Sequence, residues 1–281
     1  MDDGGLRYCR DIVRRQDPDR FLMALLAPEP RRAALLAIYA FNAEIARIRE
    51  SVSEPMLGHI RLQWWRDTID TLYADQPHGH ALAAPLAAAI SRHGLSQAHF
   101  IRLIDTREAD LDPAPLVSMD DLIDYAGGTA APLIWLGLEI CGVEDPATRD
   151  AGWHLGVAWA LSGLIRALPY HLRAGWCRLP SDLLAEHQLT QYNLREKEAG
   201  VNLRFLIQKL MEHIDINIKK SRELSRSLDK AAVPVMLAAG FAQAYQRRLA
   251  RFDYDPFDRR MADQPPFIAW RLMLRSLLGR Y

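Results

Sequence analysis

Two stretches of the sequence, both predicted to be helical, carry basic side chains that could bind a ligand. The first, YAFNAEIARIRE (residues 39–50), contains Arg47, and the second, GLIRALPYH (residues 163–171), contains Arg166 and His171. Arginine binds phosphates and carboxylates through charge-assisted hydrogen bonds. These residue types therefore point to the binding of an anion, such as a diphosphate or an acidic lipid headgroup.

The same stretches carry few carboxylates for a magnesium site, namely Glu44 and Glu50 in the first and none in the second. Mg²⁺ prefers carboxylate oxygens, and two carboxylates at i and i+4 on a helix would face one ion. Residues 151–180 include no acidic residue. Several Mg²⁺ ions beside arginines would be electrostatically unfavourable, so we expect no metal site here.

The elements that carry these residues are predicted to be helices. Apolar residues recur at three- and four-residue steps along almost the whole chain, and residues 39–54 are predicted to lie on one long helix. Pro169 should kink or end the helix of the second stretch. Ser118, with Asp121 three residues later, predicts an N-cap before a helix whose middle is rich in small residues and can approach a neighbour closely.

The overall prediction is a single all-α domain of about eight to ten helices over residues 1–281, with residues 1–16 as a loosely attached N-terminal segment. Acidic and basic residues balance at 35 each, which argues against nucleic acid as a partner. The three cysteines are widely spaced, and His78 and His80 are expected in a solvated loop. The N-terminus resembles neither a secretory signal nor a transit peptide, and no apolar run is long enough to span a bilayer.

Four segments, DRFLMALLAPEPRRAALLAIYAF, RLQWWRDTID, YAGGTAAPL and GWCRLP, stand in an order and spacing that resemble the squalene/phytoene synthase family. The similarity runs from residue 17 or so to the C-terminus. It implies an all-α isoprenoid synthase fold with a central cavity. Active members join two prenyl diphosphates head to head with Mg²⁺ held by two aspartate-rich motifs on facing helices.

The resemblance also implies where those metal ligands would stand in this chain, and position 46 is one of these places. The nearby Glu44 does not replace a ligand at position 46, because two residues along a helix turn its side chain about 200° away. We therefore expect no catalytic residue and no cofactor, with Mg²⁺ needed only if the chain is an active synthase. The degenerate positions are Ala46, Arg47 and Glu50 in the first motif and Gly163, Ala167 and His171 in the second.

Shared departures from the family pattern make one subgroup the better match. AFN-x-E, SVSE and ALPYH resemble the mitochondrial complex I assembly factor and its bacterial relatives. This implies a non-catalytic role in the assembly of respiratory complex I (NADH:ubiquinone oxidoreductase), with complex I subunits or assembly intermediates as partners. We expect a bacterial, cytoplasmic protein, with peripheral contact to the inner membrane left open, or a protein of the matrix side in a eukaryote.

Two other functions stay open at this point. One is an active head-to-head prenyltransferase, and the other is a carrier that holds an isoprenoid or an anionic lipid in the cavity. A metal-free pocket for such a ligand would draw on Tyr39, Arg47, Glu50, Arg66, Arg166 and His171.

Each of these residues also has a plain structural interpretation. Tyr39 and His171 are expected in the core, Arg66 can pair with Asp70 at i+4, and Arg47 can belong to a solvated face. Trp64 and Trp65 are expected to pack at the rim and in the core. The C-terminal segment, residues 267–281, is expected as a buried core helix, with a membrane-surface helix as the alternative.

Overall fold

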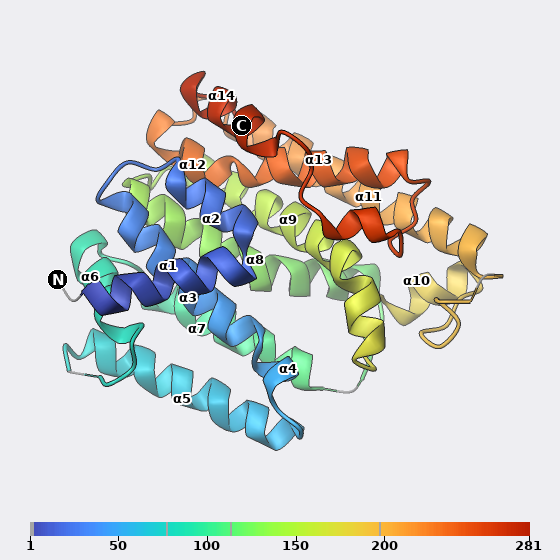
Figure 1. Ribbon diagram of the computed structural model, residues 1–281, viewed down its shortest axis with the longest axis horizontal. Coiled ribbons are helices and arrows are strands. Elements are labelled where there is room, and N and C mark those ends of the chain that lie inside the picture. The colour runs from blue at the N-terminus through green and yellow to red at the C-terminus, as the bar shows by residue number, and fades with distance from the viewer. Residues whose placement is uncertain (1–2, 77, 113, 197) are drawn as a thin grey trace.

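The computed structural model describes residues 3–76, 78–112, 114–196 and 198–281, and every regular element within these ranges is a helix (Figure 1). There are more helices than the eight to ten predicted, because one-turn segments such as α4 and α12 are too short for periodicity to detect. The helices are α1 (Asp3–Gln16), α2 (Pro18–Leu25), α3 (Arg31–Ala46), α4 (Ile48–Ser51), α5 (Pro55–Tyr73), α6 (Ala83–His93), α7 (Gln97–Glu108), α8 (Met119–Cys141), α9 (Pro146–Arg173), α10 (Ser181–Glu186), α11 (Gly200–Leu224), α12 (Val233–Met236), α13 (Ala238–Arg251) and α14 (Ile268–Leu277), with short 3-10 helices at Ala109–Leu111, Lys230–Ala232 and Arg259–Ala262.

The helices α8 and α9 form the centre of the bundle (Figure 1). A Cβ atom built on Gly156 of α9 would lie 2.6 Å from the backbone nitrogen of Ala131 of α8, so the two helices approach as closely as a missing side chain allows. The predicted close approach is thus confirmed. The predicted start of α8 is also correct, because Ser118 and Asp121 form a reciprocal capping box.

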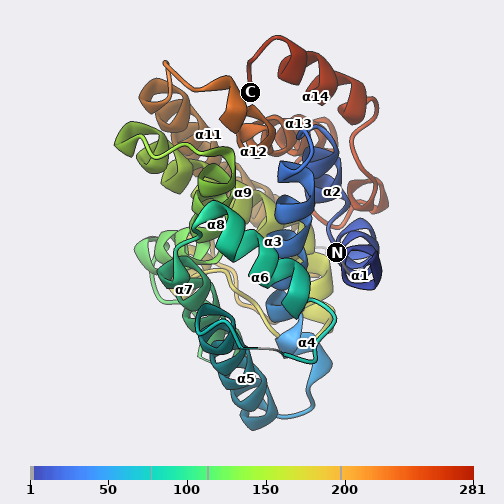
Figure 2. The same cartoon turned by 90° about the vertical axis from the view of Figure 1, so that its left-hand side faces the viewer.

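The N-terminal segment is part of the bundle, which corrects the prediction that residues 1–16 are loosely attached. Cys9 and Val13 of α1 are fully buried, and Tyr8 donates a hydrogen bond to Glu44 of α3. Figure 2 shows α1 beside α3, with which it packs. Residues 1 and 2 of this segment lie outside the described residues. The sequence of α1 is polar and rich in arginine, so its short apolar face was not recognised from the sequence.

Two helix boundaries differ from the predicted ones. The helix predicted over residues 39–54 breaks at Arg47, whose φ and ψ of −96° and 1° leave the helical range, and the chain continues as the single turn α4. The helix of the second stretch, predicted to kink or end at Pro169, does not end there but continues to Arg173. Both boundaries matter because these two segments carry the charged stretches.

The helices α5 and α14 lie at opposite ends of the molecule (Figures 1 and 2). On α5, Trp65 is buried and Trp64 is half-exposed, so the predicted core and rim packing is confirmed. The core placement predicted for α14 is wrong, because only Ile268 and Leu272 of this helix are buried. No helix in the described part of the chain is long and apolar enough to cross a membrane.

Candidate functional site

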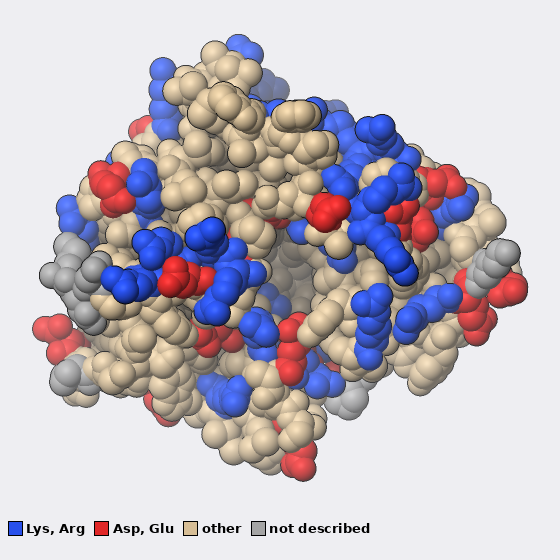
Figure 3. All heavy atoms as spheres, viewed as in Figure 1, with Lys and Arg blue, Asp and Glu red and all other residues tan. Residues whose placement is uncertain are grey.

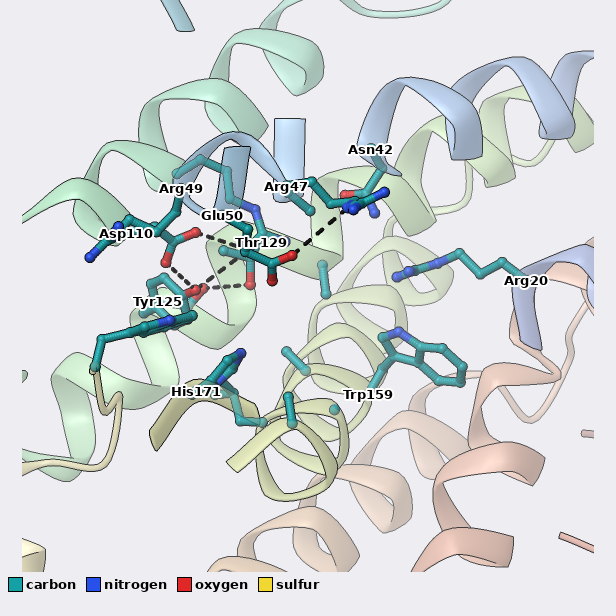
Figure 4. Close-up of a pocket in the computed structure, with 18 residues that line it drawn as sticks. Arg20, Asn42, Arg47, Arg49, Glu50, Asp110, Tyr125, Thr129, Trp159 and His171 are labelled. Carbon is teal, nitrogen blue, oxygen red and sulfur yellow. Dashed lines mark hydrogen bonds and ion pairs between the residues drawn. The ribbon is translucent and has the colours of Figure 1, made fainter. Parts of the chain in front are cut away.

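A cavity of about 260 Å³ opens between α3, α4, α7, α8 and α9 (Figure 4). The space-filling view shows a hollow near the middle of one face, with arginine and lysine side chains on either side of it (Figure 3). The cavity is lined by Arg20, Asn42, Ala46, Arg47, Arg49, Glu50, Arg107, Asp110, Tyr125, Thr129, Ala130, Trp159, Ala160, Gly163, Leu164, Ala167, His171 and Trp176.

The two motifs that the sequence singled out meet in this cavity. The break after α3 places the first motif on one wall, and the C-terminal half of α9 supplies the facing wall. All six degenerate positions line the space, namely Ala46, Arg47, Glu50, Gly163, Ala167 and His171.

The lining does not fit a cluster of Mg²⁺ ions. Ala46, Gly163 and Ala167 offer no side-chain oxygen, and the carboxylates on the wall are Glu50 and Asp110. Glu50 lies 3.8 Å from the Arg47 guanidinium, so its charge is already compensated. Across the described ranges, no group of three or more His, Cys, Asp or Glu side chains is placed to hold a metal. The donor set therefore suits an anion better than a cation.

Asp110 is the polar centre of the cavity, and sequence reasoning missed it. It is 5% exposed and lies on the 3-10 helix that follows α7. Tyr125 donates a hydrogen bond to it over 2.6 Å, and Arg107 and Arg178 approach within 3.1 and 3.7 Å. Burial, with this neighbouring carboxylate, raises the pKa of the Tyr125 phenol. Two guanidinium groups thus neutralise this carboxylate and leave it unsuited to binding a metal.

Three further arginines bring positive charge to the cavity wall. Arg20 forms an ion pair with Asp17 over 2.6 Å and lies 5.0 Å from the ring centroid of Trp159. Arg47 pairs with Glu50 as above, while Arg49 forms no ion pair with a carboxylate among the described residues. The cavity therefore carries net positive charge, although the arginines responsible are not all those predicted.

Three buried polar atoms of the cavity lining have no hydrogen-bond partner among the described residues: Asn42 Oδ1, Arg107 Nε and Trp176 Nε1. The Oδ1 atom of Asn42 accepts no hydrogen bond, although the side chain is only 6% exposed. Buried polar groups are nearly always satisfied, by water or a ligand where not by protein. Asn42 could therefore receive a donor from a bound molecule.

His171 lies in the cavity but does not contribute charge to it. Its ring packs on Trp176 with the ring centroids 3.8 Å apart. Burial, together with the nearby Arg107 and Arg178, lowers the pKa of His171 to about 4, against the partly opposing effect of Asp110. Burial thus favours the neutral imidazole, in line with the plain structural interpretation of His171 as a core residue.

Arg166 does not line this cavity, which corrects its predicted place in one pocket with Arg47 and His171. It donates a hydrogen bond to the buried carboxylate of Asp19 over 3.0 Å, and its guanidinium lies 3.6 Å from the ring centroid of Tyr245. It lines a second hollow of about 360 Å³ between α2, α9 and α13. The two hollows adjoin, because Arg20, Trp159, Gly163 and Ala167 line both of them.

Tyr39 and Arg66 also lie outside the cavity. Tyr39 is 3% exposed in the core, as its plain structural interpretation predicted. Arg66 of α5 pairs with Asp105 and Glu108 of α7, each over 2.6 Å, so the predicted pairing with Asp70 is wrong. Spacing along one helix could not reveal partners on a second helix.

His80 packs against aromatic side chains, whereas a solvated loop was predicted for His78 and His80. The His80 ring stands edge-on to Trp64, Trp65 and Tyr8, with centroid distances of 5.5, 5.3 and 5.8 Å. Burial lowers the pKa of His80. This histidine thus serves as an aromatic packing residue.

The model of a known protein family matches most of the chain, including the residues that line this cavity. The squalene/phytoene synthase family model matches residues 13–269. The chain belongs to the squalene/phytoene synthase family. In this family member, the cavity lies where the two basic stretches meet.

Several similar proteins match nearly the whole length of this chain. It is 31% identical over 275 residues to a protein named NADH dehydrogenase (ubiquinone) complex I, assembly factor 6, from Bos taurus, with 98% of this chain and 83% of the relative covered. The Homo sapiens protein of the same name is 29% identical, with 98% and 82% covered. A presqualene diphosphate synthase from Zymomonas mobilis is 30% identical over 160 residues, covering 56% of this chain and 54% of the relative.

Solved structures agree on the fold. A squalene synthase from Alicyclobacillus acidocaldarius superposes with a TM-score of 0.79 at 20% identity, covering 90% of this chain and 96% of that one. A dehydrosqualene synthase superposes with a TM-score of 0.83 at 16% identity, covering 98% and 95%. The predicted isoprenoid synthase fold is confirmed.

Proposed function

We propose that this protein is a non-catalytic family member that acts in the assembly of respiratory complex I, with complex I subunits or assembly intermediates as its partners. The observation that carries the proposal is the near full-length similarity to relatives named complex I assembly factor 6. The match to the presqualene diphosphate synthase, in contrast, covers little more than half of either chain.

The chemistry of the cavity supports the non-catalytic part of the proposal. A departing diphosphate needs its charge neutralised, and clustered divalent cations do this in metal-dependent enzymes. Here the facing walls carry Ala46, Gly163 and Ala167, and both lining carboxylates are paired with arginines. The proposed function requires no metal and no cofactor.

The test is the loss of the gene in its own organism. A deletion strain should contain less assembled complex I on native gels and show less NADH:ubiquinone oxidoreductase activity, and the intact gene should restore both. An unrelated respiratory complex in the same membranes is the control. Normal complex I in the deletion strain would overturn the proposal.

A second function is favoured by the positive charge of the cavity and by Asn42. We propose that the cavity binds an anionic group, such as the diphosphate of an isoprenoid or a lipid phosphate, without Mg²⁺. Arg20 and Arg49 would contact the anion, and the Trp159 ring offers an apolar surface beside it. This site replaces the predicted combination of Arg47, Arg166 and His171.

Calorimetry with inorganic pyrophosphate and farnesyl diphosphate, each with and without Mg²⁺, tests this binding. Arg49→Gln should weaken binding by about tenfold, the value expected for one charged hydrogen bond. Arg173→Gln is the matched control, because Arg173 is an exposed arginine on α9 outside the cavity. Binding that needs Mg²⁺, or that ignores Arg49→Gln, would contradict the proposal.

We also propose that the protein works in the cytoplasm, or on the matrix side in a eukaryote, in peripheral contact with the inner membrane. Support comes from the relatives' names, because complex I uses the membrane-dissolved substrate ubiquinone. Fractionation of cells into soluble and membrane pools, with salt extraction of the latter, checks this location. An integral or secreted protein would contradict it.

A further inference from the structure

The outer face of α14 is an apolar surface without a protein partner among the described residues. Ile268 and Leu272 hold the helix against α13, where Leu272 sits over Gly240. Such a contiguous apolar face on a soluble protein marks a site of interaction. We define the α14 surface by its outward apolar side chains, which are 37% to 77% exposed: Phe267, Trp270, Met273, Leu274, Leu277 and Leu278.

Arginines border this surface on the side that faces α13. A groove of about 400 Å³ between α13 and α14 is lined by Arg247, Arg271 and Arg275 and by no acidic residue. None of the three forms an ion pair with Asp or Glu within the described ranges. Burial, with the neighbouring cations Arg222, Arg247 and Arg271, lowers the pKa of Arg275. The groove is therefore a concentration of uncompensated positive charge.

The sequence around α14 is also basic and contains no acidic residue. Residues 264–281 include no acidic side chain, while Arg271, Arg275 and Arg280 fall among the apolar residues. Asp215 and Glu223 of α11 line a separate groove with Arg222. In the space-filling view, the end of the molecule over α14 is largely uncharged, with arginine and lysine at its margin (Figure 3).

We propose that the α14 surface binds an anionic lipid bilayer, with the apolar side chains in the headgroup boundary and lipid phosphates beside the arginines of the groove. A helix that combines an apolar face, an outward tryptophan and flanking arginines has the composition of an interfacial membrane helix. The absence of carboxylates from the groove, together with its three arginines, suits negatively charged lipid phosphates. The proposal deepens the peripheral membrane contact of the proposed function.

The experiment uses the purified full-length protein and lipid vesicles. One set of vesicles contains phosphatidylcholine alone, and the other contains phosphatidylcholine mixed with phosphatidylglycerol. The protein should sediment with the anionic vesicles, bind the neutral ones more weakly and be released by salt. Trp270 should give a blue-shifted fluorescence component on binding, which Trp270→Phe removes.

Matched substitutions assign the binding to α14. Leu274→Glu should weaken binding to anionic vesicles by about tenfold or more, since it removes an apolar side chain from the lipid boundary and adds a negative charge. Ile60→Glu on α5 should leave binding unchanged, because Ile60 and Leu274 are both 58% exposed but lie at opposite ends of the molecule. Arg271→Gln should weaken binding by about fivefold. Circular dichroism checks that each variant is folded.

Several results would overturn the proposal. Failure of the intact protein to bind anionic vesicles would do so, as would equal binding by the Leu274→Glu variant. A dimer in light scattering that Leu274→Glu converts to a monomer, without vesicle binding, would assign the surface to a second copy of the chain. Because vesicle binding is measured without complex I, its failure is distinguishable from failure of the assembly role, which the deletion strain tests.

Discussion

Arg166 and Asp19 form an ion pair at 3.0 Å that joins α9 to α2 beside the motif cavity. Asp19 is 3% exposed and also accepts hydrogen bonds from Tyr245 of α13 and from Gln264. Arg166 belongs to the second basic stretch of the sequence, yet its charge is used within the protein. This ion pair therefore gives Arg166 a structural role.

Removal of Asp19 should destabilise the protein strongly. Asp19→Ala leaves the Arg166 guanidinium and the Tyr245 hydroxyl without their acceptor, and breaking a buried ion pair in this way costs about 3–5 kcal/mol. The free energy of unfolding from urea titration is the measurement. Glu186→Ala is the control: Glu186 pairs with Lys209 on the surface at 2.6 Å, and its loss should cost no more than about 1 kcal/mol. Equal effects of the two substitutions would contradict the role of Asp19.

Two glycines of α9 should respond in opposite directions to the same substitution. Gly156→Ala places a Cβ 2.6 Å from the backbone of Ala131, and this overpacking should cost about 1–3 kcal/mol. Gly163→Ala meets nothing within 4 Å and should stabilise the helix by up to about 1 kcal/mol. Thermal unfolding of the two variants checks this. A Gly156→Ala variant as stable as Gly163→Ala would show that α8 and α9 are less closely packed than described.

Stability should fall on acidification partly because of His171. Its pKa is about 4 in the folded protein, below the ordinary value of about 6.5 in an unfolded chain. The unfolded chain therefore binds the proton first, and stability that is present above pH 6.5 is lost as the pH falls towards 4. His171→Phe keeps a ring over Trp176 and should flatten this part of the pH dependence.

The measurement for His171 is the urea midpoint at several pH values from 7 to 4. Carboxylates also titrate in this range, so the quantity of interest is the difference in slope between the variant and the intact protein. His59→Phe is the control, because His59 is an exposed histidine of α5. An unchanged slope in the His171→Phe variant would contradict a buried, neutral imidazole.

The sequence predicted the fold and the meeting of the two motifs because both rest on helical periodicity and motif order. Ala46 and Gly163 line one cavity, as their motif positions imply. The capping box of Ser118 and Asp121 was also predictable, since both partners lie within one turn. These are properties of single helices or of the family's shared arrangement.

The remaining features depend on contacts between helices, which spacing does not encode. Asp110 stands in an ordinary-looking stretch, and only the fold brings Arg178 to it from 68 residues away, a separation that no local pattern reveals. Arg166 lies in the second hollow, where it donates a hydrogen bond to Asp19, 147 residues earlier in the chain. The sequence of α14 is apolar on more than one face, so its burial could not be decided before its neighbours were placed.

The motif cavity could be examined for residual chemistry most directly by a turnover assay. Purified protein would be incubated with farnesyl diphosphate, geranylgeranyl diphosphate, Mg²⁺ and NADPH, and both released pyrophosphate and hydrocarbon products would be measured. An active squalene synthase and a heat-inactivated sample serve as positive and negative controls. Because Ala46, Gly163 and Ala167 supply no metal ligands, we predict no pyrophosphate above the heat-inactivated level from protein that is folded by circular dichroism. Pyrophosphate release or a hydrocarbon product would contradict the non-catalytic account and would mean that other carboxylates hold the metal.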